Sequence, residues 1–226
     1  MQRKPEINYR EFRFNKLKSR EFSHLKLLIF WPFFGLAFLF VERFYRVESY
    51  YPMHCFIDDM IPFCEIFLIP YLFWFVFLIG MHLYTLLYDA DTFEKMMKYI
   101  IITYSAAIII YLFFPTCQNL RPEFFERSNI FTEFLEGFYV FDTNTNVCPS
   151  IHVIGSLAVM FAAWNAKGLE APGYKIAFGI MALLICLSTV FLKQHSILDV
   201  LAAIPISLAA YPLCYRKKDR TKNALR

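Results

Sequence analysis

The chain has 226 residues, of which 58% are hydrophobic and 19% are aromatic, and its net charge is +4. This apolar fraction and a mean hydropathy of +0.43 exceed soluble averages and indicate a protein with several membrane-spanning segments. The charge is small and its basic residues gather at the two ends of the chain, so no nucleic-acid surface is implied. The 6 cysteines show no C-x-x-C spacing, which argues against a zinc site or a redox pair.

Several apolar stretches approach the roughly 20 residues that a membrane-spanning helix needs. They cover residues 25–41, 62–88, 96–114, 149–166, 174–192 and 197–215. The sequence therefore predicts an all-α, polytopic membrane protein built as a bundle of six transmembrane helices.

Lysines and arginines lie mainly before the first of these stretches and after the last. Because basic residues of short loops face the cytoplasm, we expect a basic cytoplasmic N-terminal segment over residues 1–24 and a basic cytoplasmic tail over 216–226. The membrane domain lies between them, over residues 25–215. The loops at 42–61 and 115–148 hold two basic residues each and are expected to face outward.

The stretch INYREFRFNKLKSREF, at residues 7–22, alternates aromatic and basic side chains. It is compatible with an amphipathic helix that lies on the anionic inner leaflet. A partly ordered basic flank of the first span is the alternative, and the sequence leaves both open.

Residues 188–199, STVFLKQHSILD, place polar side chains between two strongly apolar runs. His195 and Asp199 are four residues apart, so on a helix they lie on one face, one turn apart. An aspartate in an apolar helix costs about 2.5–3.5 kcal/mol on insertion and is expected to have a partner. A carboxylate on one ring nitrogen raises the basicity of the other, so His195 can act as a nucleophile or a base.

Two further polar groups fall on the same side of the predicted bundle. In NVCPSIHV, at residues 146–153, Pro149 suits the first helical position of a helix whose N-terminus attracts anions. Ser150 adds a hydroxyl donor there, and His152 is close enough in sequence to reach the same anion. Arg121 offers a planar, permanently charged fork suited to phosphate oxygens. No carboxylate cluster typical of magnesium phosphatases stands out.

Three short motifs resemble those of the type 2 phosphatidic acid phosphatase and haloperoxidase superfamily. They are RP at 121–122, PSIH at 149–152 and ST-x5-H-x3-D at 188–199, against the family pattern K-x6-RP, PSGH and SR-x5-H-x3-D. The resemblance covers roughly residues 60–215. The segments FPT…RP and STVFLKQH resemble the inositol phosphorylceramide synthase-like branch of this superfamily more than its phosphatases.

The resemblance implies a role for each matched residue. His195, oriented by Asp199, would attack phosphorus and form a phosphohistidine. His152 would protonate the leaving alkoxide and then activate water or an acceptor alcohol. Arg121 and Ser150 would hold the phosphoryl oxygens, and no metal or cofactor is expected.

Three positions depart from the family pattern. Phe114 stands where the first lysine is expected, Ile151 replaces the glycine of the second motif and Thr189 replaces the arginine of the third. We expect Lys193, which lies two residues before His195, to supply part of the lost positive charge. The alternative is that the Lys193 side chain only extends to the membrane surface, as lysines near helix ends commonly do. Lys193 and Thr189 complete the predicted phosphate-binding set.

The sequence thus predicts a metal-independent membrane phosphatase that acts on a lipid phosphate, with its site facing outward from the plasma membrane. A phosphotransferase that moves a phospho-headgroup to an alcohol acceptor would use the same residues. A transporter is disfavoured because transporter sites usually lie near the bilayer midplane, whereas the polar residues here are predicted at the outward ends of the spans. Because Thr189 replaces the arginine of the family pattern, a family member that has lost its catalytic activity is a further alternative.

The expected partners are a lipid phosphate and the bilayer, and no nucleic acid. The identity of the lipid and the oligomeric state stay open. Cys117 and Cys148 fall on the outward side, and the sequence does not decide whether they pair.

Overall fold

The computed structural model describes residues 5–45 and 47–216 of the chain. The first residues of the predicted N-terminal segment, Arg46 and nearly all of the predicted basic tail lie outside the described residues. Within the described part, the only strands are β1 (Tyr51–Pro52) and β2 (Thr116–Cys117), which pair in parallel. All other regular structure there is helical.

Within the described ranges, five helical stretches are long and apolar enough to cross a membrane. They are Ser23–Arg43, which ends in α1 (Phe30–Arg43), Glu65–Tyr88, which ends in α3 (Leu68–Tyr88), α4 (Ala90–Phe113), α7 (Pro172–Phe191) and α8 (Ile197–Tyr215). The predicted span at 149–166 is the exception: it corresponds to α6 (Ile151–Asn165), an apolar helix of only 15 residues. The all-α, polytopic membrane fold is therefore confirmed, with one helix shorter than expected.

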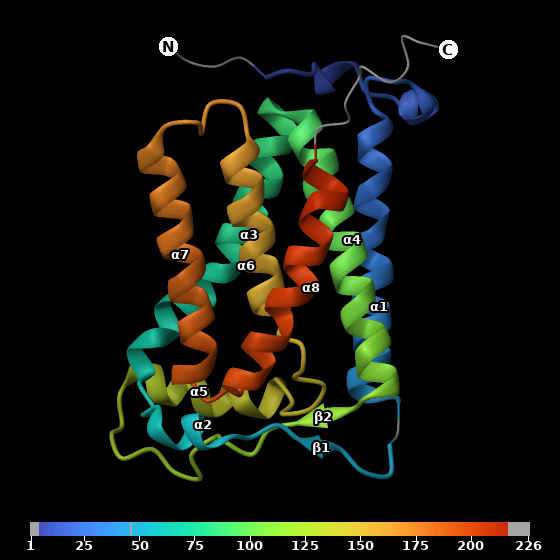
Figure 1. The fold of residues 1–226 in the computed structure, drawn as a ribbon. Coiled ribbons are helices and arrows are strands. Elements are labelled where there is room, and N and C mark those ends of the chain that lie inside the picture. The colour runs from blue at the N-terminus through green and yellow to red at the C-terminus, as the bar shows by residue number, and fades with distance from the viewer. Residues whose placement is uncertain (1–4, 46, 217–226) are drawn as a thin grey trace.

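The long helices stand side by side in Figure 1. The beginning of the described chain and the end of α8 lie at one end of the bundle. The short helix α2 (Phe56–Met60), the helix α5 (Ile130–Phe141) and the two strands lie at the opposite end. This arrangement agrees with an even number of crossings.

Helix α6 forms the centre of the bundle and contacts α3, α4, α7 and α8. Small side chains allow these close approaches, and α6 carries several of them in its buried face. They are Gly155, Ser156, Ala158, Ala162 and Ala163. The helix is consequently surrounded by protein along most of its length.

The N-terminal stretch does not form a continuous amphipathic helix. Residues Tyr9–Glu11 and Phe14–Lys18 form short 3-10 turns instead. The aromatic side chains are partly drawn into the protein: Phe22 is fully buried, and the Tyr9 hydroxyl lies 2.8 Å from His24 Nε2. The ordered basic flank is the interpretation that the structure supports.

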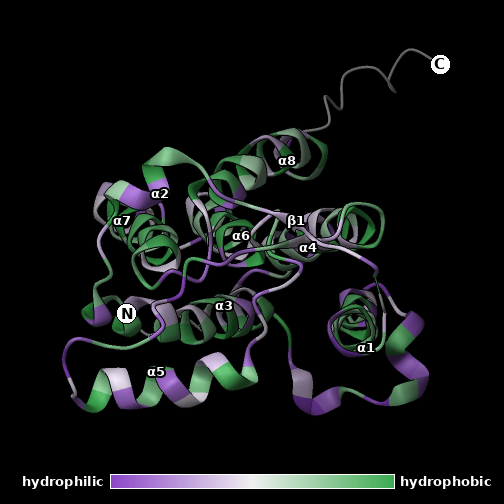
Figure 2. Cartoon of the chain, turned by 90° about the horizontal axis from the view of Figure 1, so that it is seen from below, coloured by the Kyte–Doolittle hydropathy of each residue, from purple (hydrophilic) through white to green (hydrophobic). Residues whose placement is uncertain are grey.

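The helix α5 was not anticipated within the long loop before α6. Asn129 caps its first turn by accepting hydrogen bonds from the backbone N–H groups of Phe131 and Thr132. Within α5, the side chain of Leu135 is fully buried, whereas that of Ile130 is exposed. Figure 2 shows α5 lying crosswise beside α3 while the spans are seen nearly end-on, so α5 runs along the margin of the bundle at this end.

A side chain at position 155 should destabilise the bundle. A Cβ at Gly155 would lie 2.6 Å from the Tyr104 hydroxyl and 3.0 Å from the Trp74 ring, both of which are buried. Gly155→Ala should therefore lower the stability by about 1–3 kcal/mol, measured as the midpoint of thermal unfolding in detergent. Gly80→Ala is the matched control, because nothing lies within 4 Å of its Cβ position. Equal midpoints for both variants would contradict the packing described here.

Candidate active site

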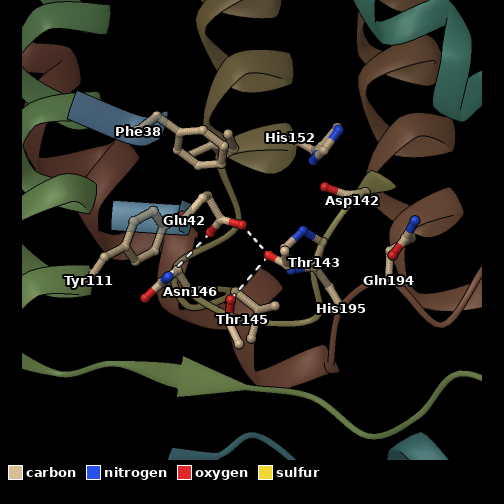
Figure 3. A pocket seen from close by; sticks show the side chains of 12 residues that line it. Phe38, Glu42, Tyr111, Asp142, Thr143, Thr145, Asn146, His152, Gln194 and His195 are labelled. Atoms are coloured by element: carbon tan, nitrogen blue, oxygen red, sulfur yellow. Dashed lines mark hydrogen bonds between the residues drawn. The ribbon is translucent and has the colours of Figure 1, made fainter. Parts of the chain in front are cut away.

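A cavity of about 40 Å³ lies at the end of the bundle where α5 and the strands gather (Figure 3). It is lined by Phe38, Glu42, Tyr111, Asp142, Thr143, Thr145, Asn146, Val147, Ile151, His152, Gln194 and His195. A space of this size has room for water molecules.

The imidazole rings of His152 and His195 meet at this cavity. Their centroids are 5.8 Å apart and the rings are edge-on to each other. His152 lies in the first turn of α6, where its ring stacks on Tyr71 at 4.7 Å and packs beside Trp74 at 4.5 Å. Its Nδ1 atom is buried and has no hydrogen-bond partner. Aromatic packing, rather than a hydrogen bond at this nitrogen, holds the His152 ring.

His195 is oriented by the fully buried Asp199. Its Nδ1 lies 3.1 Å from Asp199 Oδ2, and the same oxygen accepts the backbone N–H of Ser196 at 3.0 Å. Because the carboxylate accepts at Nδ1, the Nδ1–H tautomer leaves the Nε2 lone pair of His195 available. The pairing predicted from the sequence is present. His195 lies just before α8, however, and Asp199 reaches it as part of the capping box around Ser196.

Asp58 of α2 holds the segment that carries His195. Its carboxylate accepts hydrogen bonds from the Ser196 hydroxyl at 2.6 Å, the Ile197 N–H at 2.8 Å and the Cys55 N–H at 2.9 Å. Burial by itself would raise the pKa of the Asp58 carboxyl, but these hydrogen bonds outweigh it and lower the pKa. Asp58 is thus a structural residue that caps α8 from a distant part of the chain.

Lys193 fixes the same junction from the other side. Its Nζ donates to the carbonyl oxygens of Asp58 at 2.7 Å and of Ile61 at 2.5 Å. Its backbone has a φ of 53°, in the left-handed region. Burial lowers the pKa of the Lys193 ammonium. The side chain does not line the cavity, and its predicted phosphate contact stays a prediction.

Arg121 lies beside the cavity, with both Nη atoms engaged and with its buried Nε lacking a hydrogen-bond partner. It donates to the carbonyl oxygens of Tyr139, Asp142 and Thr143 at 2.8–3.1 Å and to Gln194 Oε1 at 2.5 Å. It also lies 4.6 Å above the Tyr139 ring. Arg121 therefore organises the loop that follows α5, and it reaches the cavity through Gln194.

The remaining two predicted phosphate ligands also lie behind the cavity wall. Ser150 is fully buried, caps α6 with its hydroxyl and donates its N–H to the Asp199 carbonyl at 3.2 Å. Thr189 is fully buried, and its carbonyl oxygen accepts the N–H of His195 at 3.0 Å. Both residues support the two motifs, and their contact with phosphate stays a prediction.

Two carboxyl groups that the sequence did not single out line the cavity. Glu42, at the end of α1, accepts hydrogen bonds from the Thr143 hydroxyl and from Asn146 Nδ2 (Figure 3). Asp142 lies 3.6 Å from the Arg121 guanidinium, and burial raises the pKa of its carboxyl. Among the described residues that line the cavity, none is a lysine or an arginine.

Gln194 and Tyr111 are two further wall residues that motif reasoning missed. The Tyr111 hydroxyl donates to the Pro149 carbonyl at 2.6 Å and so anchors the turn before α6. Gln194 stands directly before His195 in the polar stretch between α7 and α8, and its polarity there was the available signal. For the cavity-lining loop between α5 and α6, the available signal in the sequence was the polar run DTNTN at residues 142–146.

The sequence predicts no metal site and leaves the pairing of Cys117 and Cys148 open. Residues 5–45 and 47–216 contain no group of three or more His, Cys, Asp or Glu side chains that could hold a metal ion. Cys117 and Cys148 are free cysteines.

Removal of the Asp58 carboxylate should loosen α8. Asp58→Asn loses at least one of the three accepted hydrogen bonds and should lower stability by about 1–3 kcal/mol at neutral pH. The adjacent Asp59 is 65% exposed and pairs with His54, so Asp59→Asn should leave the unfolding midpoint unchanged.

The pH dependence of this effect has a defined sign. The pKa of Asp58 is lower in the folded protein than its ordinary value of 3.8. Its stabilising contribution is therefore fully present above pH 3.8 and is lost as the pH falls through the lowered folded pKa. Thermal unfolding of the wild type and Asp58→Asn over this range should converge at the acidic end, and a difference that persists there would refute the capping role.

Comparison with known proteins agrees with the three motifs. The profile of the PAP2 superfamily matches residues 95–222, which is more than half of the chain and includes Arg121 and both histidine motifs. No curated protein and no solved structure matches the chain. The chain belongs to the PAP2 superfamily, whose members are typically phosphatases and phosphotransferases.

Proposed function

We propose that the protein is a metal-independent, integral membrane lipid phosphate phosphatase that works through a phosphohistidine. One observation carries this proposal. The rings of His152 and His195 lie 5.8 Å apart at one cavity, and Asp199 occupies only Nδ1 of His195. A phosphoryl group between the two rings would have a nucleophile on one side and a proton donor on the other.

In the first step, the Nε2 lone pair of His195 attacks phosphorus in line with the ester bond. The N–P bond forms as the P–O bond to the lipid alkoxide breaks, and protonated His152 gives its proton to the leaving oxygen. Asp199 stabilises the positive charge that develops on His195. The negative charge of the bound phosphate favours the protonated form of His152.

In the second step, neutral His152 removes a proton from water. The water oxygen attacks phosphorus, the N–P bond breaks and inorganic phosphate leaves. His195 regains its Nε2 lone pair and His152 regains its proton, so both residues return to their initial states.

Transfer of a phospho-headgroup to an alcohol is the second candidate function. Glu42 and Asp142 place two carboxyl groups in the cavity wall. Carboxylates repel the dianion of a phosphomonoester more strongly than the monoanion of a phosphodiester. A diester donor would leave a phospho-headgroup on His195 that an alcohol can accept, as in the inositol phosphorylceramide synthase-like branch.

We place the site on the outward face of the plasma membrane. The support is the distribution of charge: the described part of the N-terminal stretch, which is rich in basic residues, lies at the end of the bundle opposite α5 and the strands (Figure 1). Basic flanks of this kind stay in the cytoplasm.

Loss of either histidine should abolish or strongly impair turnover. Purified wild-type protein should release phosphate from a panel of lipid phosphates in EDTA. After a quench in alkaline denaturant, which preserves phosphohistidine, the wild type should show a phosphoenzyme and His195→Ala should show none, and His152→Ala should slow turnover by about 10²–10⁴-fold. His54→Ala is the control, since His54 is exposed, pairs only with Asp59 and does not line the cavity. An active His195→Ala would overturn the proposal, and product that forms only with an added alcohol would identify a transferase.

The orientation can be tested by labelling single cysteines in intact cells. In a background without the 6 native cysteines, Ser128→Cys lies before α5 on the cavity side and Ser19→Cys lies in the basic flank. A membrane-impermeant maleimide should label only the cysteine at position 128. Labelling of position 19 alone would invert the topology.

A further inference from the structure

The cavity poses a chemical problem for any phosphoryl ligand. Anionic oxygens need hydrogen-bond donors, yet the described residues of the lining include no lysine or arginine. The two Nη atoms of Arg121 donate to three carbonyls and to Gln194 Oε1, and its buried Nε has no hydrogen-bond partner. Because Arg121 does not line the cavity, the donors that face a ligand there belong to the histidines and to neutral side chains.

Gln194 has such a donor. Its side chain lines the cavity together with His152 and His195 and is only 3% exposed (Figure 3). Its Nε2 amide group is buried and has no hydrogen-bond partner. A buried donor left without an acceptor costs about 1–3 kcal/mol. Such a group beside two histidines indicates an acceptor atom that arrives with the ligand.

Arg121 fixes the direction of this amide. The guanidinium only donates hydrogen bonds, so the atom of Gln194 that it contacts at 2.5 Å must be the oxygen. The N–H₂ end is thereby directed away from Arg121, and a flip of the amide would place two donors against each other. The contact with a cation also polarises the amide and strengthens its N–H as a donor.

We propose that Gln194 is a phosphate-binding residue, whose Nε2–H₂ donates to a non-bridging oxygen of a phosphoryl group bound between His152 and His195. Arg121 is a positioning residue that acts through Gln194. This inference rests on the proposed function, because it assigns an oxyanion donor to the same site. It requires no direct contact between phosphate and Arg121, Lys193 or Thr189.

Gln118 supplies a matched control. It is also fully buried with an unpaired Nε2, but it does not line the cavity. Replacement of either glutamine by methionine removes an amide of similar size. Only the change at position 194 should affect a ligand in the cavity.

Binding of orthovanadate, which adopts the five-coordinate geometry of phosphoryl transfer, tests the proposal. The ring centroids of Trp74 and His152 are 4.5 Å apart, so tryptophan fluorescence should report whether vanadate occupies the cavity. Gln194→Met should weaken vanadate binding at least tenfold and lower kcat/KM for the lipid phosphate, whereas Gln118→Met should change neither. Gln194→Glu keeps the acceptor for Arg121 but puts a carboxylate at the phosphate, and it should weaken binding further.

The outcomes separate this inference from the proposed function. If the wild type binds vanadate, His195→Ala does not, and both folded Gln194 variants bind like the wild type, the role of Gln194 is refuted and the function stands. If the wild type neither binds vanadate nor turns over any lipid phosphate, both proposals fail. If Gln194→Met does not fold, the result with Gln194→Glu decides, since that variant retains the bond to Arg121.

Discussion

The carboxylate of Asp58 at the N-terminus of α8 is the interaction on which the site geometry depends. It accepts hydrogen bonds from Ser196 and Ile197, and Lys193 ties the preceding turn to the carbonyl of the same aspartate. An anion at a helix N-terminus is favoured by the helix dipole as well as by the free N–H groups. His195 lies between these two anchors, so its ring position is set by α2 as much as by α8.

This dependence shows that the walls of the site come from more of the chain than the family profile matches. Asp58 and Glu42 precede residue 95, as do Tyr71 and Trp74, which flank His152. The matched region supplies both histidines, and the preceding helices supply their packing and the acidic part of the lining. The chemistry of the motifs therefore depends on residues that lie before the matched region.

The sequence was most informative where the determining physics is local. Hydropathy over some 20 residues located the spans, because each apolar run is itself the cause of its burial in the bilayer. The pairing of His195 with Asp199 followed from their spacing, although a helix cap rather than a helix face brings them together. Both histidines were selected from their motifs, and the structure places their rings at one cavity.

The rest depends on contacts that spacing does not encode. The partners of Arg121 include backbone carbonyls of a loop far along the chain, and carbonyls leave no signature in residue types. Glu42 meets that loop only because α1 ends beside it. The orientation of Gln194 follows in turn from Arg121, so it could not be read before the loop was placed.

The shortness of α6 has a consequence for depth. A helix of 15 residues rises about 1.5 Å per residue, or about 22 Å, against a hydrocarbon thickness of about 30 Å. Its two ends cannot both reach the lipid–water boundary, and surrounding helices, not lipid, shield whichever end is recessed. If the recessed end is the one that carries His152, phosphate ester chemistry takes place several ångströms beneath the headgroup plane, and a lipid must sink or the bilayer must thin for the two to meet.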